Sequence, residues 1–122
     1  MDKHINVVLA SDDNYAQHVA VVTVSILKNT KFADQLHFFV LSDDISDKKI
    51  KLIKKTVEKF NAKIEFIDIG HDKLKNIYLS GHVSRAAYFR LMIADLVSED
   101  VKKIIYLDVD LLVCEDIFNL WK

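Results

Sequence analysis

The chain has 122 residues and a mass of 14.1 kDa, which suits a single domain spanning residues 1–122. Apolar residues make up 51% and charged residues 29% of the chain, and this balance excludes a largely disordered protein. The formal net charge of -1 gives no electrostatic argument for nucleic acid or an anionic membrane as the partner.

The composition also limits the kinds of site. Cys114 is the single cysteine, so we expect no intramolecular disulfide, and we interpret it as an inert core thiol in a reducing, cytoplasmic compartment. Gly70 and Gly81 are the only glycines, which excludes a Gly-rich phosphate loop. No signal peptide is visible, and the longest mostly apolar run, residues 19–27, is too short for a transmembrane segment. The five histidines form no metal-ligand spacing.

Apolar runs alternate with amphipathic stretches along the chain. The pattern predicts strands over residues 5–9, 36–41, 64–67 and 104–107, with helices over 15–29, 46–60 and 84–97. A further short strand is expected over 111–113, and a helix or turn over 117–121. Ser46 is a plausible start of the second helix. The lysine-rich run within that helix, residues 48–59, is most simply its solvated face.

Strands that alternate with helices predict an α/β fold with a mostly parallel sheet. Right-handed crossovers place the loops that leave the strands at one edge of such a sheet, where ligands bind. Three acidic loops, at residues 12–13, 43–44 and 108–110, should meet there.

A strand that ends in two carboxylates is the first candidate site. Asp108 and Asp110 follow the continuous apolar run 104–107, which predicts a strand covered on both faces. In an extended chain, residues i and i+2 point the same way, so both carboxylates can bind one hard divalent cation. Such a cation could hold a diphosphate and neutralise a leaving group. The competing interpretation is that both side chains are merely solvated at the end of a surface strand, and the spacing alone leaves both open.

The turn after the first predicted strand, residues 10–15, is the second candidate. Asp12 could accept a hydrogen bond from a base N–H or a ribose hydroxyl, and Asn14 can both donate and accept. The alternative, favoured for so short a motif on its own, is a helix N-cap in which Asp12, Asp13 or Asn14 satisfies free backbone N–H groups.

The predicted third helix contributes Arg90 as the third candidate. Its apolar neighbours Phe89 and Leu91 give the guanidinium a setting in which it needs an anionic partner. That partner is either a phosphate of a ligand or a carboxylate of the acidic loops, and both stay open.

Together and in this order, the three motifs resemble those of glycosyltransferase family 8, the retaining nucleotide-sugar glycosyltransferases of the glycogenin and lipopolysaccharide galactosyltransferase type. Residues 10–15, 84–90 and 106–113 carry the resemblance, and residues 116–121 resemble the family's short element that ends in Leu-Trp. The resemblance covers essentially the whole chain. It implies a GT-A type fold, with a Rossmann-like sheet flanked by helices and a UDP-sugar bound at its carboxyl edge.

The resemblance also implies roles by position. Asp108 and Asp110 match the family's DxD motif, so both would ligate Mn²⁺ (or Mg²⁺), and Asp108 or Val109 would also lie near the ribose. The cation would act as a Lewis acid on the departing UDP. Arg90 matches the arginine that contacts the donor sugar and the diphosphate.

Residues in and around the turn after the first predicted strand also match the family's donor site. Ala10, Asp12 and Asn14 match the residues around uracil and ribose. Ala87 stands where some relatives have a hydroxyl residue, so the resemblance implies no hydrogen bond there.

Members of the family are about twice this long or longer, and the histidine that is their third metal ligand has no match here. The resemblance therefore implies an incomplete sheet, the N-terminal, donor-binding half of an enzyme, and poor sugar transfer by this chain alone. The acceptor, a glycan or a lipid, is not identified. For the parent enzyme, a peripheral membrane location is compatible with the resemblance.

Two other functions stay open at this point. Haloacid-dehalogenase-like phosphatases also have a DxD after an apolar strand, but usually after the first strand, which makes this alternative the weaker one. The other is an inactive nucleotide-binding or structural module that associates with another chain. An incomplete sheet leaves an unpaired edge, which favours self-association, expected near Trp121.

Overall fold

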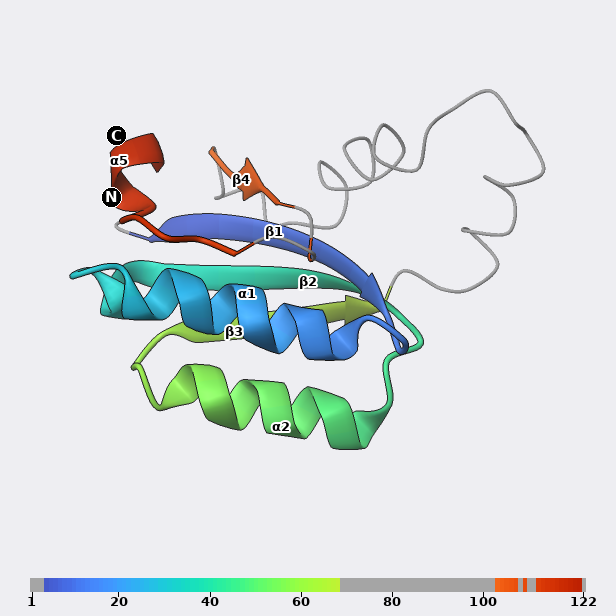
Figure 1. Cartoon of the computed structure of the whole chain (residues 1–122). Helices are drawn as coiled ribbons and strands as arrows, with labels where there is room; N and C mark the ends of the chain where they lie inside the picture. The colour runs from blue at the N-terminus through green and yellow to red at the C-terminus, as the bar shows by residue number, and fades with distance from the viewer. Residues whose placement is uncertain (1–3, 69–102, 108, 110–111, 122) are drawn as a thin grey trace, which may run out of the picture.

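A computed structural model describes residues 4–68, 103–107, 109 and 112–121. In these residues one parallel sheet has the strand order β3-β2-β1-β4 (Figure 1). Its strands are β1 (Ile5–Asp12), β2 (Leu36–Asp43), β3 (Lys63–Asp68) and β4 (Ile105–Tyr106). The helical elements are α1 (Ala16–Lys28), the 3-10 turn η1 (Ala33–Gln35), α2 (Asp47–Glu58) and α5 (Phe118–Trp121). The α/β fold with a parallel sheet is thus confirmed, whereas the helix predicted over 84–97 lies outside the described residues.

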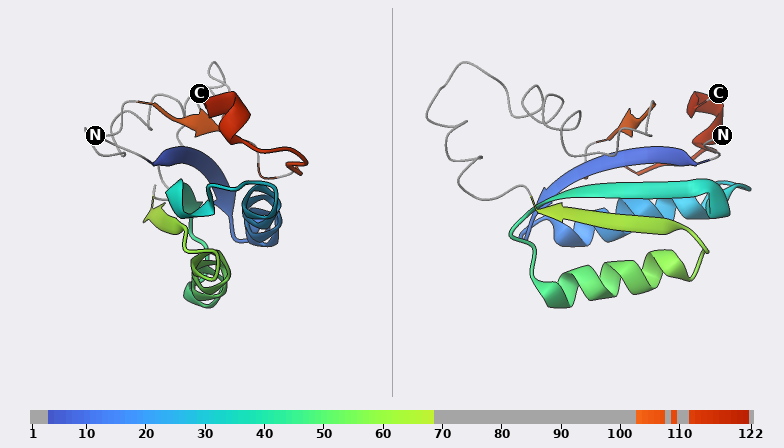
Figure 2. Two further views of the ribbon diagram at one scale, coloured as in Figure 1. Left: turned by 90° about the vertical axis from the view of Figure 1, so that its left-hand side faces the viewer. Right: turned by 180° about the vertical axis from the view of Figure 1, so that it is seen from behind.

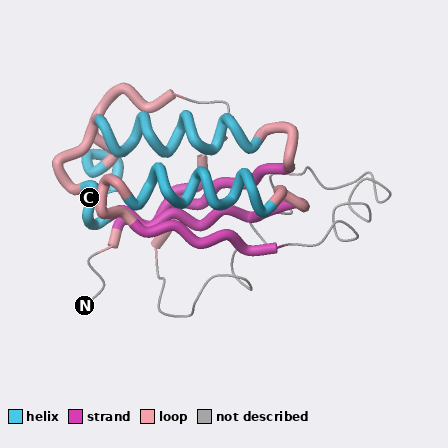
Figure 3. Tube along the Cα trace, turned by 90° about the horizontal axis from the view of Figure 1, so that it is seen from below, coloured by secondary structure: helices cyan, strands magenta, loops and turns pink. Residues whose placement is uncertain are grey.

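The path of the chain through the sheet changes direction once. From β1 the chain passes to β2 and then to β3, always toward the same side, and β4 pairs with the other side of β1. Right-handed crossovers in one direction place both connecting helices on one face of the sheet. Figures 1, 2 and 3 show α1 and α2 side by side on that face. The sheet therefore has its topological switch point between β1 and β4.

The strands β1, β2 and β3 are paired nearly flush at their carboxyl ends, whereas β4 ends opposite Val8 of β1. The β1–β2 register runs from Ile5 opposite Leu36 to Asp12 opposite Asp43. The β2–β3 register ends with Ser42 opposite Asp68. On the other side of β1, the N–H of Leu107 donates to the carbonyl of Val8 over 3.0 Å. All of these strands point their carboxyl ends toward the same edge.

The main core lies between the sheet and the two helices. Alternate residues of β1 and β2 face α1 and α2, and the helices contribute apolar residues spaced three and four apart. These side chains are buried: Ile5, Val7, Leu9, Val19, Val22, Ile26, Leu36, Phe38, Val40, Ile53 and Val57. Val8, Phe39 and Leu41 alternate with them and are also buried, so the central strands are covered on both faces.

Two turns use side chains other than glycine in the left-handed region. Asp44, between β2 and α2, has φ 58°, and Asn61, between α2 and β3, has φ 61°. Asp and Asn tolerate this conformation better than other non-glycine residues. Beside Asp44, the N–H of Ile45 donates to Ser42 Oγ over 3.3 Å, which closes the turn. A chain with so few glycines therefore makes its tight turns with Asp and Asn.

The segment near the carboxyl end departs from the sequence prediction. The strand predicted over 111–113 is wrong for the two of its residues that are described, because Leu112 and Val113 belong to no strand. The backbone of Val113 is instead held by side chains of α1 and of its C-cap residue. Asn29 Nδ2 donates to the Val113 carbonyl over 2.8 Å, and the Val113 N–H donates to Ser25 Oγ over 3.0 Å. We call these two residues, Ser25 and Asn29, the α1 clamp.

Two burial predictions for this region also fail. Cys114 is exposed rather than a core thiol, because the α1 clamp holds its neighbour Val113 against the outside of α1 rather than within the sheet. The strand around β4 is half-buried rather than fully covered. Further along, the rings of Phe32 and Phe118 lie 4.5 Å apart between centroids, so α5 packs against the segment between α1 and η1.

The ionisable side chain of His37 lies on the sheet face away from the helices. His37 stacks on Phe39 at 4.2 Å between ring centroids, and its Nε2 lies 2.9 Å from Glu65 Oε2. Burial lowers the pKa of His37 below its usual value of 6.5, and this outweighs the Glu65 carboxylate, which raises it. The folded protein thus resists protonation of this ring.

The α1 clamp predicts a stability loss that is specific to Ser25. In Ser25→Ala the N–H of Val113 loses its acceptor, so we expect the free energy of unfolding to fall by about 1–2 kcal/mol. Urea denaturation measures this. Thr56→Ala is the control, because it removes a hydroxyl bonded only to its own helix at Leu52, and it should change stability by less than about 0.5 kcal/mol. Equal losses in both variants would contradict the clamp.

His37 predicts a pH effect with a defined sign. A histidine whose folded pKa is depressed stabilises the fold above the unfolded pKa of 6.5, and this contribution is lost as the pH falls below that value. We therefore expect the wild-type protein to lose its stability advantage over His37→Gln as the pH falls from 8 to 5. Urea denaturation across that range measures it. A difference that widens toward acid would mean that the pairing with Glu65 dominates instead.

Candidate functional site

The carboxyl edge of the sheet collects polar residues from neighbouring strands. Asp12 and Asp43 are paired in register at the ends of β1 and β2, and Ser11, Ser42 and Asp68 form the adjacent row. Neighbouring strands lie about 4.8 Å apart, so these side chains are close neighbours. The predicted meeting of the loops at residues 12–13 and 43–44 is confirmed. Asp68 was not singled out from the sequence; its only signal is its position directly after an apolar strand.

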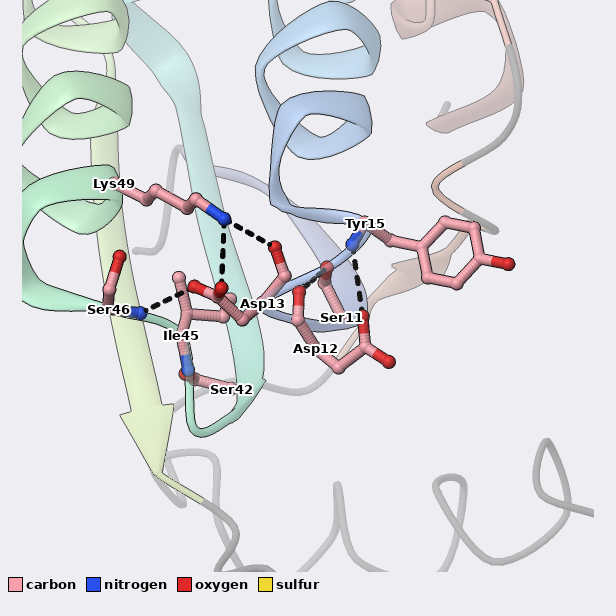
Figure 4. A network of polar contacts seen from close by, with 8 residues as sticks. All are labelled: Ser11, Asp12, Asp13, Tyr15, Ser42, Ile45, Ser46 and Lys49. Atoms are coloured by element: carbon pink, nitrogen blue, oxygen red, sulfur yellow. Dashed lines mark hydrogen bonds and ion pairs between the residues drawn. The ribbon is translucent and has the colours of Figure 1, made fainter.

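Asp12 is held by its own turn. Its Oδ1 accepts a hydrogen bond from the N–H of Tyr15 over 3.0 Å (Figure 4). Tyr15 is itself the N-cap of α1 and makes no side-chain cap hydrogen bond, so the prediction that Asp12, Asp13 or Asn14 is the N-cap is wrong. Asp12 instead satisfies a backbone N–H of the turn before the helix. One carboxylate oxygen is then used by the backbone, and the Asp12 side chain has a fixed orientation at the end of β1.

Asp13 turns toward the second helix. Its Oδ1 accepts from the N–H of Ser46, and its Oδ2 lies 2.9 Å from Lys49 Nζ, which also donates to the Asp13 carbonyl over 3.0 Å (Figure 4). The hydrogen bonds from Lys49 and from Ser46 hold the pKa of Asp13 below its usual value. Asp13 therefore joins the loop after β1 to the start of α2, a role that the sequence did not suggest for Lys49.

The remaining predicted residues fall into two groups. Ala10 is half-buried in β1, Asn14 is exposed in the turn before α1, and Val109 is half-buried against the main core. Asp108, Asp110 and Arg90 lie outside the described residues. Of the predicted site, the structure thus places Ala10, Asp12, Asn14 and Val109, and it brings Ala10 and Asp12 together on β1.

The chemistry of this edge is set by its carboxylates. Asp43 is only 9% exposed. Asp12 is paired with it in the same row across the strands, and Asp68 stands in the adjacent row, opposite Ser42. Carboxylate oxygens suit a hard cation or the hydroxyl groups of a sugar, and they repel an anion that arrives without a cation. Within the parts of the chain that the structure describes, no group of three potential metal ligands is complete.

Two surface hollows involve the helices of the molecule. The larger, about 580 Å³, runs between α1 and residues 112–114. The smaller, about 210 Å³, lies between α1 and α2 and is lined by Asp13 and Lys49 among others. Asn14 lines the smaller hollow, whereas neither hollow is lined by Ala10 or Asp12.

Comparison with protein families and curated proteins gives consistent results. Residues 6–122 match the family model of glycosyl transferase family 8. The chain is 36% identical over 121 residues to general stress protein A of Bacillus subtilis, of which it covers 42%. It is 32% identical over 116 residues to a lipopolysaccharide 1,2-glucosyltransferase of Escherichia coli K12, of which it covers 34%. The chain therefore spans less than half the length of these relatives.

Solved structures agree with the sequence comparison. The galactosyltransferase LgtC, crystallised with donor and acceptor sugar analogues, superposes with a TM-score of 0.79 at 27% identity. The match covers 97% of this chain and 42% of that one. The fold is therefore a partial domain of the GT-A type, as the motifs indicated. By the match over nearly its whole length, together with the order of its motifs and strands, the chain is a member of glycosyl transferase family 8.

Proposed function

We propose that this chain forms the donor-nucleotide-binding portion of a retaining, metal-dependent glycosyltransferase that transfers a hexosyl group from a UDP-sugar. The family supplies the class of reaction, and two of the similar proteins are named as a glucosyltransferase and a galactosyltransferase. The acceptor would be a glycan or a lipid. The same family match makes a DxD phosphatase or an inactive module the less favoured alternative.

The observation that carries the proposal is the reversal of strand order between β1 and β4. In open α/β sheets, ligands bind outside the carboxyl ends of the strands at such a switch point. Residues 10–15 form the end of β1 and the turn after it, and the residues that follow β4 in the sequence include Asp108, Val109 and Asp110. The two motifs of the sequence would thus flank the switch point.

The residues of β1 and its turn would recognise the nucleoside. Ala10 has no side chain beyond Cβ, so a planar base can approach the strand there. The second oxygen of Asp12 would accept a hydrogen bond from the uracil N–H or a ribose hydroxyl, while its first oxygen keeps the turn in place. Asn14 would provide a further donor and acceptor from the exposed side of the turn.

A cation suits this edge for an electrostatic reason. A diphosphate is repelled by the Asp12 carboxylate at this edge unless a positive charge lies between them. We assign Asp108 and Asp110 as the residues that would hold Mn²⁺ or Mg²⁺, because two carboxylates one residue apart offer the oxygen ligands these ions take. When bound, the cation would neutralise charge on the departing UDP. Arg90 would contact the diphosphate and the donor sugar.

The location is a proposal as well. None of the helices in the described ranges has both the length and the apolar composition needed to cross a membrane. We propose that the enzyme is cytoplasmic and that its chains self-associate. Light scattering would measure this self-association.

Isothermal titration of UDP, with and without Mn²⁺, tests the assigned site. We expect Mn²⁺-dependent binding to the wild-type chain and its loss in the double variant Asp108→Ala, Asp110→Ala, because the diphosphate then lacks its counter-charge. Retained circular dichroism and unfolding midpoint in the variant would show that the fold survives. UDP binding that is equally strong without the cation, or in the double variant, would refute the metal assignment.

A matched pair of neighbouring variants separates recognition from structure. In Asp12→Asn the amide oxygen can still accept from the N–H of Tyr15, but the charge is gone, so we expect UDP affinity to fall on the order of tenfold with little loss of stability. In Asp13→Asn the ion pair with Lys49 is lost instead, and UDP affinity should stay within about twofold. A larger affinity loss for Asp13→Asn than for Asp12→Asn would contradict the assignment.

A further inference from the structure

Positive charge is concentrated on one helix of the molecule. Residues 47–59 contain six lysines against two carboxylates, a formal charge of +4, so the rest of the chain carries -5 of the total of -1. The net charge of the whole chain therefore conceals a strong separation of positive from negative charge. The acidic carboxyl edge lies on the sheet, whereas the basic residues belong to α2.

The lysines form a line along the outward side of α2. Lys48, Lys51, Lys55 and Lys59 recur at intervals of three and four residues, which places them on one helical face. All four are exposed, and the opposite face carries the buried residues Ile53 and Val57. We call these four residues the lysine stripe. Lys49 is not part of it, since Lys49 is bonded to Asp13.

No carboxylate of the described residues neutralises the lysine stripe. The ion pairs found in these parts of the chain are His37 with Glu65 and Lys49 with Asp13. From Lys48 to the C-cap residue Lys59 the stripe is about 17 Å long, because the helix rises about 1.5 Å per residue. Beside it, Leu52 is 59% exposed and is the large apolar side chain of α2 that reaches the surface among the lysines.

We propose that the lysine stripe of α2 is a docking surface for an anionic lipid membrane, with Leu52 entering the interfacial region. A helix that lies flat on a bilayer shows lysines toward the headgroups and an apolar side chain toward the acyl boundary. The helix α2 contains no arginine or aromatic residue, and these are the side chains that most often read or stack on nucleic-acid bases. This inference does not depend on the proposed sugar-transfer function, because it involves a different surface.

Vesicle flotation tests the proposal with the intact chain. We expect the protein to float with vesicles that contain phosphatidylglycerol and not with phosphatidylcholine alone, with less binding at higher ionic strength. Each lysine near an anionic surface contributes on the order of fivefold to partitioning. The triple variant Lys48→Gln, Lys51→Gln, Lys55→Gln should therefore lower partitioning on the order of a hundredfold. Glutamine is a good helix former, so α2 should persist.

A second triple variant controls for net charge. Lys28→Gln, Lys31→Gln, Lys63→Gln removes the same formal charge from exposed lysines outside the stripe, and we expect most of the binding to remain. Leu52→Gln should reduce specifically the binding that resists salt. Equal losses in the two triple variants would overturn the proposal, as would absence of flotation with anionic vesicles. Stripe-dependent binding to duplex DNA but not to vesicles would likewise overturn it, in favour of a polyanion partner.

Discussion

The in-register pairing of β1 with β2 is the constraint on which the rest of the molecule depends. A slip of one residue would turn Ile5, Val7 and Leu9 away from the helices and place Asn6 and Val8 in the core instead. The same slip would separate Asp12 from Asp43. Burial of alternate apolar residues thus fixes both the core and the row of carboxylates, because the two are set by one register.

Polar side chains then hold the loops to this frame. Asp12 orders the turn before α1, Asp13 joins that turn to α2, and Ser42 closes the turn that follows β2. Each contact satisfies a backbone N–H near a helix start or turn, where the regular ladder provides no partner. With glycine absent from these turns, side-chain oxygens provide the local order near the strand ends.

Much of the fold was predictable because its signals are local. The runs at residues 5–9 and 36–41 and the amphipathic spacing around Ile53 and Val57 identify strands and a helix without further information. The strand order, and hence the switch point beside β1, was not predictable, since it depends on pairing between β1 and β4, which are about a hundred residues apart in the chain.

The predictions that failed also concern contacts between residues far apart in the chain. The run at 111–113 looks like a strand, but at Val113 the α1 clamp takes the backbone groups that a sheet would use, and this competition cannot be read from the run itself. Cys114 was misjudged for the same reason. For the candidate site, the turn at Asp12 and the meeting of the acidic loops were predictable, whereas the use of Asp13 by Lys49 depends on a distant helix.

The α1 clamp has a consequence for the order of folding. Residues 5–68 form β1, α1, β2, α2 and β3 from pairings that are close in the chain, whereas Ser25 and Asn29 reach Val113 across 88 and 84 residues. Closing so long a loop is entropically costly before any contact compensates for it. During synthesis the first three strands and their helices can thus assemble while α1 still lacks the segment that will dock on it. Ser25 and Asn29 then lie on a helix that has already formed, and Val113 can bind to them once it has been synthesised.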